Sequence, residues 1–219
     1  MRHVRQALED VAWYVRDEGV ARAARRVLRL CFDAISRRIY SHDITIVHCA
    51  ALESWPDFKP ENALVIRLAA AADLDRLSDE LPPSVIRAFR ARFDEGQIMF
   101  LAEVDGKPAG YAWMCTKPGS RPARDHGLDL KPGEGVHYGS MTLEKFRRQG
   151  IYTALQRFSR AHMRARGYSR VYGGANIRIP APVRMMKNLH LRPVHLCHIT
   201  RILGRRRVWV QPVPPDFGV

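Results

Sequence analysis

A strand, a basic turn and a helix are expected in succession between Gly135 and Arg166, and this run constrains the fold more than any other stretch. The turn reads Arg147-Arg148-Gln149-Gly150 and stands directly before a helical pattern. Backbone N–H groups at a helix start lack intrahelical partners, and the helix dipole adds partial positive charge there. A glycine lets an anion come close to the backbone. The run predicts a phosphate-binding helix start, although a plain loop-to-helix junction with solvated arginines explains the same residues.

The positive charge of the chain is concentrated after this turn. The formal net charge is +14, and residues 141–219 hold 16 Lys and Arg against 2 Asp and Glu. Residues 51–140 hold 11 against 14. This distribution favours an anionic partner, which a phosphorylated cofactor, a nucleic acid or an acidic membrane surface could supply.

Apolar runs are too short to cross a bilayer, and charged residues from Arg2 onward interrupt any signal-peptide core. We therefore expect a cytoplasmic protein. The cysteines form no CxxC pair, which argues against a disulfide framework and against a zinc site. We interpret them as small buried hydrophobic residues: Cys31, Cys49, Cys115 and Cys197.

The length of 219 residues suits one domain with an appended segment. We expect an N-terminal helical extension with one strand over residues 1–60 and a main domain over residues 61–213. Residues 4–39 are helical in pattern, with a break at Gly19, and residues 42–52 form a β-branched strand. An apolar stripe and a basic stripe run side by side from Val20 to Ile35. Such a helix packs on its own domain or on a second copy in a homodimer more often than it lies on an anionic membrane surface.

The main domain is expected to be a mixed sheet with helices on its faces. Asp105-Gly106 between two apolar runs predicts a hairpin. Residues 117–134 are rich in Gly and Pro and form a long loop. The expected strands are residues 63–68, 97–104, 108–116, 135–143, 170–175, 194–202 and 207–210, and the expected helices are residues 73–78, 83–93, 150–166 and 181–189.

With the turn in place, this order resembles the GNAT superfamily of acyl-CoA-dependent N-acyltransferases, roughly from Ala63 to Val210. The family turn, Arg/Gln-x-x-Gly-x-Gly/Ala, is matched by Arg147 to Tyr152. The hairpin from Glu103 to Tyr111 is similar to the one before the family's cofactor strand. The segment from Asn176 to Leu191 is similar to the one that lies along the far side of the cofactor.

The resemblance implies an α/β (α+β) mixed sheet whose two central parallel strands splay apart and admit coenzyme A. Here these strands would be residues 135–143 and 170–175. The pyrophosphate would lie on the turn and the pantetheine along the first strand, like an added strand. The donor would be acetyl-CoA or another acyl-CoA. The implied cofactor-binding residues are Met141, Thr142, Leu143, Arg147, Arg148, Gln149, Gly150, Ile151, Tyr152, Thr153 and Asn176.

Four residues depart from the family pattern. Tyr152 replaces a small residue of the turn, and its ring must point away from the phosphates. Met186 falls where many members have the tyrosine that protonates the leaving thiolate, and a thioether cannot give a proton. His190-Leu191 replaces Gly-Phe.

Acyl transfer to an amine also needs a general base and a donor for the oxyanion. In the family the base tends to lie on the cofactor strand, where Glu134 and His137 are the candidates here. Alternation predicts Glu134, Tyr138 and Ser140 on one face of that strand and His137 on the other. His190, His195 and His198 have no carboxylate or cysteine set with them, so we expect no metal site.

The sequence therefore predicts an N-acyltransferase that moves an acyl group, expected to be acetyl, to a primary amine of a small molecule or a protein. Two alternatives stay open. The basic C-terminal third could bind nucleic acid, which we disfavour because no recognised binding motif is present. The chain could also be a catalytically silent GNAT-like binding module.

Overall fold

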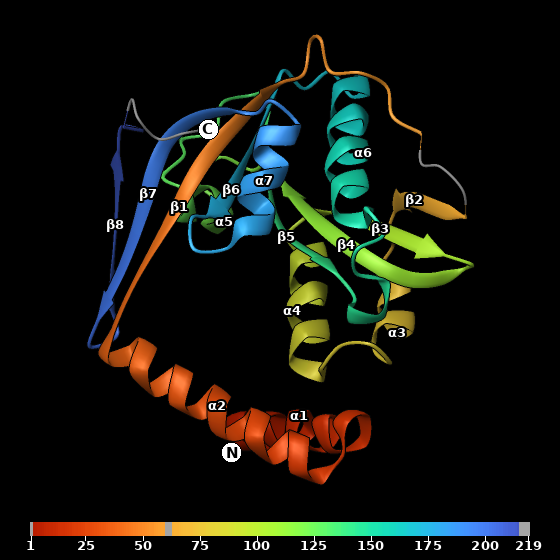
Figure 1. The fold of residues 1–219 in the computed structure, drawn as a ribbon, viewed down its shortest axis with the longest axis vertical. Coiled ribbons are helices and arrows are strands. Elements are labelled where there is room, and N and C mark those ends of the chain that lie inside the picture. Colours follow the sequence, from red (N-terminus) through yellow and green to blue (C-terminus); the bar gives the residue numbers. More distant parts are fainter. Residues whose placement is uncertain (1, 60–62, 215–219) are drawn as a thin grey trace. The chain divides into compact units, whose positions relative to one another are not determined.

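A computed structural model describes residues 2–59 and 63–214 (Figure 1). The chain divides into two compact units. The first comprises residues 1–41, 70–96 and 201–205, and the second residues 42–69, 97–200 and 206–219. The division is discontinuous, and the boundary expected near residue 60 stays a prediction.

The described residues form helices and strands in the following order of labels. The helices are α1 (Arg2–Glu18), α2 (Val20–Ile39), α3 (Asp73–Leu77), α4 (Pro83–Asp94), α5 (Arg121–Asp125), α6 (Ile151–Ala165) and α7 (Pro180–Asn188), with the 3-10 turn η1 (Glu144–Phe146). The strands are β1 (Tyr40–Ala51), β2 (Leu64–Leu68), β3 (Ile98–Val104), β4 (Lys107–Cys115), β5 (Glu134–Thr142), β6 (Arg170–Asn176), β7 (Arg192–Ile202) and β8 (Arg205–Gln211). The expected strands and long helices are confirmed within about two residues, and α5 is a short helix inside the expected long loop.

The strands form one mixed sheet in the order β2-β3-β4-β5-β6-β1-β7-β8. The strand expected in the N-terminal extension is therefore an inner strand, because β1 pairs with β6 in antiparallel register from Thr45 opposite Asn176 to Ala51 opposite Arg170. The hairpin at Asp105-Gly106 joins β3 to β4, as expected. No helix in the described ranges is long and apolar enough to cross a membrane.

The parallel strands β5 and β6 pair only over their first halves. Their ladder runs from Glu134 opposite Arg170 to His137 opposite Gly173. Beyond His137, β5 continues to pair with β4 while β6 continues to pair with β1. The two central strands therefore separate at His137, as the resemblance implied.

A β-bulge in β5 lies just beyond the point of separation. Trp113 pairs with Tyr138 and Tyr111 with Met141, so two residues of β5 face one residue of β4. One of the two is Gly139, whose φ is 59°. An extra residue reverses the alternation of side chains. The predicted alternation is wrong beyond this point, because the bulge places Ser140 on the same face as His137, within 3.3 Å of its ring.

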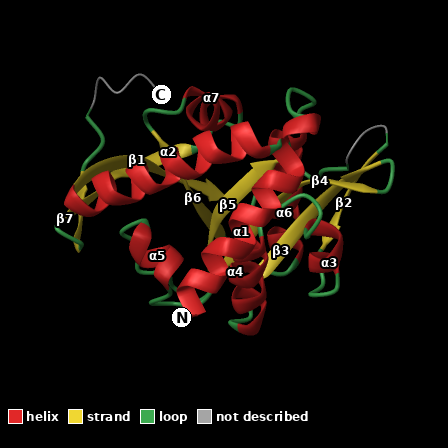
Figure 2. Cartoon of the chain, turned by 90° about the horizontal axis from the view of Figure 1, so that it is seen from below, coloured by secondary structure: helices red, strands yellow, loops and turns green. Residues whose placement is uncertain are grey.

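The core of the second unit lies between the sheet and the helices α6 and α7. It contains buried residues of β1, β3, β4 and β6 together with residues of both helices, among them Ile46, Phe100, Leu155 and Met186. A smaller apolar cluster lies under α5 on the other face of the sheet, around Ala123 and Val136. Figure 2 shows α7 and α5 on opposite sides of β1 and β6.

In the first unit, α1 packs against α2 and α4. Asp10 caps α4 by accepting a hydrogen bond from the Ser84 N–H group at 3.0 Å. Arg87 forms an ion pair with Glu9 at 2.8 Å. The break between α1 and α2 falls at Gly19, where φ is 80°, as the sequence predicted.

Candidate active site

A pocket of about 820 Å³ opens where β5, the following turn, α6 and α7 meet. The turn between β5 and α6 consists of two short bends. η1 ends at Phe146, and Arg148 and Gly150 then adopt left-handed conformations with φ of 65° and 74°. The pocket is lined by Ser140, Met141, Thr142, Arg147, Arg148, Gly150, Ile151, Tyr152, Thr153, Ile179, Pro180, Arg184, Met185 and Asn188.

The N-terminus of α6 lines this pocket. Gly150 precedes the helix, and its carbonyl accepts from the Ala154 N–H group at 3.0 Å. The N–H groups of Ile151, Tyr152 and Thr153 therefore come before the first intrahelical hydrogen bond. The side chains of Arg147, Arg148 and Arg184 add positive charge around the same opening. A helix N-terminus surrounded by guanidinium groups suits a phosphate or pyrophosphate.

The free edge of β5 forms a second wall. One edge of the strand is paired with β4, where Met141 lies opposite Tyr111 and Thr142 opposite Gly110. The other edge of β5 has no paired strand beyond His137, because the ladder with β6 ends there. An extended chain with amide groups can pair with such an edge. A coenzyme A molecule, with its pyrophosphate and its amide-bearing arm, fits the charge and the hydrogen-bonding groups of both walls.

Eight of the residues predicted to bind the cofactor line this pocket: Met141, Thr142, Arg147, Arg148, Gly150, Ile151, Tyr152 and Thr153. Three others lie elsewhere. Leu143 is buried, and its N–H group donates to the Ala109 carbonyl at 2.9 Å. Gln149 lines a neighbouring pocket of about 560 Å³ beside β2 and α6. The Asn176 side chain accepts from the Arg178 N–H group at 2.9 Å and so shapes the turn after β6.

A buried chain of polar side chains begins at the floor of the pocket. The Ser140 Oγ atom lies 3.3 Å from His137 Nδ1 and 3.2 Å from Gln156 Nε2. Gln156 Nε2 also lies 3.2 Å from His137 Nδ1. The other end of the Gln156 amide, Oε1, accepts from Arg160 Nη1 at 2.6 Å. Two residues of β5 are thus linked to two residues of α6.

The hydrogen bonds among these side chains set the protonation of His137. A guanidinium can only donate, so Gln156 must present its oxygen to Arg160 and its NH₂ group to His137 and Ser140. His137 Nδ1 is then the acceptor nitrogen, and the ring proton lies on Nε2. Burial, then Arg160, then His48 lower the pKa of His137 well below its usual range. The imidazole is therefore neutral and can accept a proton at Nδ1.

Glu134 occupies a different environment. It begins β5, at the end remote from the turn, and its carboxylate is engaged on both oxygens. Oε2 accepts from the Lys131 N–H group at 2.9 Å, and Oε1 lies 3.2 Å from the Tyr172 hydroxyl and 3.3 Å from Arg170 Nη1. These bonds join the start of β5 to β6, so the carboxylate has a structural role where the two strands are still paired.

Tyr152 lines the pocket, whereas Met186 is fully buried in the core. Burial raises the pKa of the Tyr152 phenol, and the nearby Arg160 opposes that shift. The phenol is therefore protonated at neutral pH. Of the two adjacent methionines of α7, Met185 is the one that lines the pocket.

The sequence analysis missed Gln156, Arg160 and His48. A signal for the first two exists, because both fall on the buried face of α6, where the surrounding positions are apolar. Ile151, Leu155 and Met163 share that burial. A glutamine and an arginine on an apolar helix face must find partners in the core, which marks them for attention.

These features define an α/β protein in which two parallel strands separate beside an anion-binding helix start. The chain belongs to the acetyltransferase (GNAT) family, whose model matches residues 62–178. Family membership supports acyl transfer as the general activity. No curated protein matches the chain. No group of three or more His, Cys, Asp or Glu side chains suited to a metal ion occurs in the part of the chain that is described.

Solved structures share the fold at low sequence identity. A putative GNAT-family acetyltransferase from Novosphingobium aromaticivorans is 16% identical with a TM-score of 0.53, over 73% of this chain and 63% of that one. A GCN5-related N-acetyltransferase from Sphaerobacter thermophilus is 16% identical with a TM-score of 0.52, over 84% and 57%. A functionally unknown conserved protein from Staphylococcus epidermidis is 12% identical with a TM-score of 0.52, over 78% and 66%. The chain spans less than two thirds of the length of these relatives.

Proposed function

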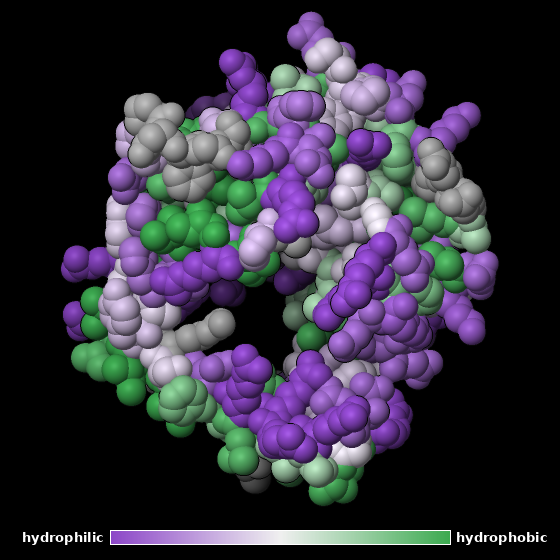
Figure 3. All heavy atoms as spheres, in the orientation of Figure 1, coloured by the Kyte–Doolittle hydropathy of each residue, from purple (hydrophilic) through white to green (hydrophobic). Residues whose placement is uncertain are grey.

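We propose that this protein is an N-acyltransferase that moves an acyl group, acetyl in the simplest case, from acyl-coenzyme A to a primary amine. The observation that carries the proposal is the pocket that joins the free edge of β5 to the N-terminus of α6. Hydrophilic side chains lie over α6 and α7, as they do over much of the visible face (Figure 3). Three arginines beside the helix start favour the phosphates of the donor. The thioester would supply the activated acyl group.

We assign the general base to His137 rather than to Glu134. The neutral His137 ring accepts at Nδ1, and Ser140 joins that nitrogen to the pocket floor at 3.3 Å. A proton taken from the amine would pass to the Ser140 oxygen as the Ser140 proton moves to His137 Nδ1. Glu134 has its oxygens engaged and lies at the opposite end of the strand.

We assign the protonation of the leaving thiolate to Tyr152. A methionine has no proton to give, whereas the Tyr152 phenol lines the pocket and is protonated at neutral pH. Unpaired backbone N–H groups on the free edge of β5 would stabilise the oxyanion. The three roles lie on elements that meet at the same pocket.

Acetyl-CoA should raise the melting temperature of the protein, and Gly150→Glu should abolish that rise by placing a carboxylate at the helix start. Gly167→Glu is the matched control. Both glycines have positive φ, 74° and 80°, and no atom within 4 Å of an added Cβ, so both substitutions strain the backbone alike. The absence of any thermal shift or heat of binding with saturating acyl-CoA would refute the proposal.

A silent binding module is the second candidate, because the thioether of Met186 stands where the family pattern has a tyrosine. A screen of amines that measures free thiol release separates the two. Donor binding without thiol release over the whole panel would favour the silent module.

A further inference from the structure

Four buried polar atoms of one side-chain cluster have no hydrogen-bond partner among the described residues. They are Nε and Nη2 of Arg160, Nε2 of His137 and Nδ1 of His48. The three side chains are at least nine-tenths buried. Buried polar atoms without partners are rare in native structures, and a cluster of four calls for an explanation, such as a bound group that satisfies them.

The sheet brings the two histidines together. His137 of β5 and His48 of β1 both lie opposite Gly173 of β6, so the three residues form one row across the sheet. A Cβ on Gly173 would lie 2.5 Å from the His48 ring. Because Gly173 has no side chain, the His48 imidazole can occupy the space over β6. Burial lowers the pKa of both histidines, and the nearby Arg160 lowers it further.

Arg160 is a buried cation, and no anionic side chain in the described ranges forms an ion pair with it. Burial lowers its pKa to about 10, so the guanidinium stays charged at neutral pH. The groups that favour its charge are Tyr152 and Cys49, and burial raises the pKa of both, which keeps them neutral. Its Nη1 group donates to the Gln156 carbonyl at 3.0 Å and to Gln156 Oε1 at 2.6 Å. Its Cζ atom lies 5.6 Å from the centroid of the Trp55 ring. A buried charge is stable only when it is paired.

The open atoms of Arg160 have a specific geometry. Nε and Nη2 are adjacent donors on one edge of the guanidinium, which is the arrangement that binds both oxygens of a carboxylate. The Nε2–H group of His137 is a third donor. Its Nδ1 atom remains with Ser140 and Gln156, so the proposed base and this donor use different atoms of one ring.

We propose that Arg160, His137 and His48 bind a carboxylate carried by one of the two substrates. The proposal rests on the proposed acyltransferase function. Ser140 lines the pocket and contacts Gln156, which contacts Arg160, so the cluster lies just beneath the pocket floor. The carboxylate could belong to a dicarboxylic acyl group on the donor, or to an amino acid acceptor. In the first case an acetyl group would be too short to reach the site, whereas in the second case acetyl could still be the group transferred.

Two arms of a kinetic experiment distinguish these sources. The first compares succinyl-CoA with butyryl-CoA, which has the same chain length without the charge. The second compares amino acids with their carboxamides. We expect one arm to favour the carboxylate. Arg160→Met should lower the ratio of kcat/KM for the carboxylate substrate to kcat/KM for its neutral counterpart by about 10- to 100-fold. Arg157→Met is the matched control, because Arg157 is an exposed residue of the same helix.

A binding measurement tests the carboxylate site independently of acyl transfer. Succinate should raise the melting temperature of the native protein more than succinamide does, and Arg160→Met should remove the difference. That result without any thioester consumption would refute the acyltransferase function and leave the carboxylate site standing. Two results together would overturn the proposal of a carboxylate site. They are acyl transfer without a carboxylate preference in either arm, and equal shifts of the melting temperature with succinate and succinamide. Water would then be the occupant of the cluster.

A different observation, in the first unit, carries a second proposal. The apolar stripe of α2 is exposed, with Phe32 at 70% of its full accessibility. The turn between β7 and β8 adds Leu203, which is 77% exposed and whose N–H group donates to the Ile39 carbonyl at 3.0 Å. The two elements therefore form one surface, which we call the apolar patch. It comprises Val20, Leu28, Phe32, Ile35, Ile39, Tyr40, Ile202 and Leu203.

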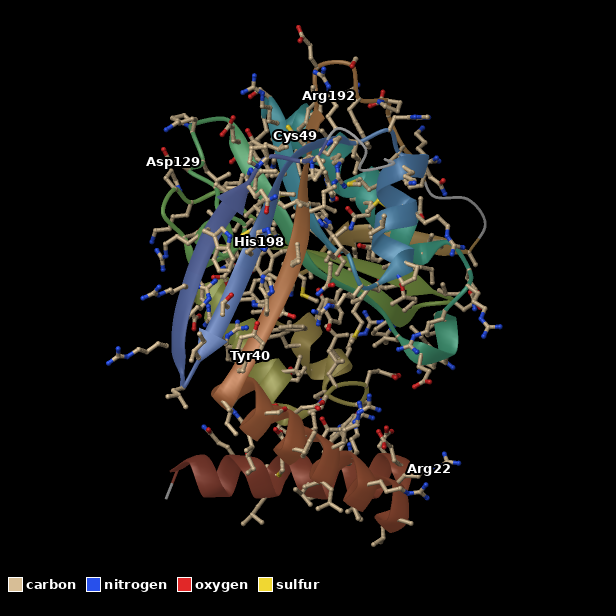
Figure 4. The ribbon with its side chains drawn as sticks, turned by 60° about the vertical axis from the view of Figure 1, so that its left-hand side comes forward. Arg22, Tyr40, Cys49, Asp129, Arg192 and His198 are labelled. Atoms are coloured by element: carbon tan, nitrogen blue, oxygen red, sulfur yellow. The ribbon has the colours of Figure 1, made fainter. Side chains whose placement is uncertain are left out.

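Basic side chains accompany the apolar patch. Arg22, Arg25 and Arg29 are exposed on α2, and Arg205 is exposed beside Leu203. Figure 4 shows Arg22 and Tyr40 toward opposite ends of α2. Figure 3 shows hydrophobic side chains at the lower left, where α2 ends at the β7–β8 turn, with hydrophilic side chains beside them. An apolar stripe flanked by arginines is typical of a helix that lies in the surface of an anionic bilayer.

We infer that the apolar patch docks on an anionic lipid surface. The sequence favoured packing of this stripe within the protein or on a second copy, whereas α2 leaves it exposed. The protein should sediment with vesicles of phosphatidylglycerol and phosphatidylcholine in equal parts, and not with phosphatidylcholine alone. Phe32→Asp and Leu203→Asp should each abolish sedimentation, whereas Val65→Asp, at an exposed position of β2, should not. A dimer in solution that Phe32→Asp dissociates, without vesicle binding, would overturn the inference in favour of a second copy.

Discussion

Arg160 Nη1 lies 2.6 Å from Gln156 Oε1, and this contact orders the polar groups beneath the pocket. Because a guanidinium has no acceptor, the Gln156 amide has one allowed orientation and His137 has one favoured tautomer. The proposed base at the pocket is therefore oriented by a residue of α6 that the donor need not touch.

Gln156→Leu should lower kcat with little change in the KM of the acyl donor. The substitution removes the NH₂ group that holds His137 and Ser140 and leaves Arg160 Nη1 without its side-chain acceptor. We expect a loss of stability of about 1–3 kcal/mol, as for a broken buried hydrogen bond to a charged group. Steady-state kinetics and urea unfolding measure the two effects, and a change confined to KM would contradict the positioning role.

His137→Gln should lower kcat/KM by about 10²- to 10⁴-fold, the usual contribution of a general base. Burial, Arg160 and His48 hold the pKa of His137 well below its usual range, so the base stays neutral at pH 6.5 and below. The acidic limb of the rate profile should therefore lie below pH 6.5. Arg160→Met should raise the pKa of His137 and so move the acidic limb toward higher pH. An acidic limb that does not move would show that it does not report the titration of His137.

The stability of the protein should fall as the pH falls below about 6.5, the usual pKa of histidine in an unfolded chain. Burial and Arg160 lower the pKa of His48 and of His137 in the folded state, with further contributions from His126 to the first and from His48 to the second. The unfolded chain then binds more protons below pH 6.5, so the stabilisation is complete above that pH. His48→Gln should flatten the dependence in urea unfolding between pH 5 and 7, and an unchanged slope would contradict the assignment.

Tyr152→Phe should lower kcat while leaving donor binding intact, because the ring remains and only the phenolic proton is lost. Burial raises the pKa of the phenol, so the acid form persists through neutral pH. Thioesters of more acidic thiols need less protonation and should be less affected. Equal losses for good and poor leaving groups would show that Tyr152 has a packing role instead.

Much of the fold could be predicted from the sequence, because the strongest signals were local. Alternation, the Asp-Gly turn and the glycine before α6 each depend on a few neighbouring residues, and the matching elements formed. The inner position of β1 was not accessible in this way, because it depends on pairing between Thr45 and Asn176, far apart in the chain. The arginine turn indicated an anion pocket, whereas the buried cluster required three elements to meet at Gly173.

Gly139→Ala tests the bulge that separates the predicted face of Ser140 from the observed one. Gly139 has φ of 59°, a conformation that costs an L-residue about 1–2 kcal/mol. The strand can avoid that cost by losing its bulge, which would return Ser140 to the face away from His137. We therefore expect a loss of stability of this size, a fall in kcat, and the loss of the proton link between the pocket and His137. Gly96→Ala is the control, since its φ of 75° carries the same strain away from the pocket. Urea unfolding with kinetics on both variants measures the difference, and equal stability losses with equal, unchanged kcat would show that the bulge does not aim Ser140.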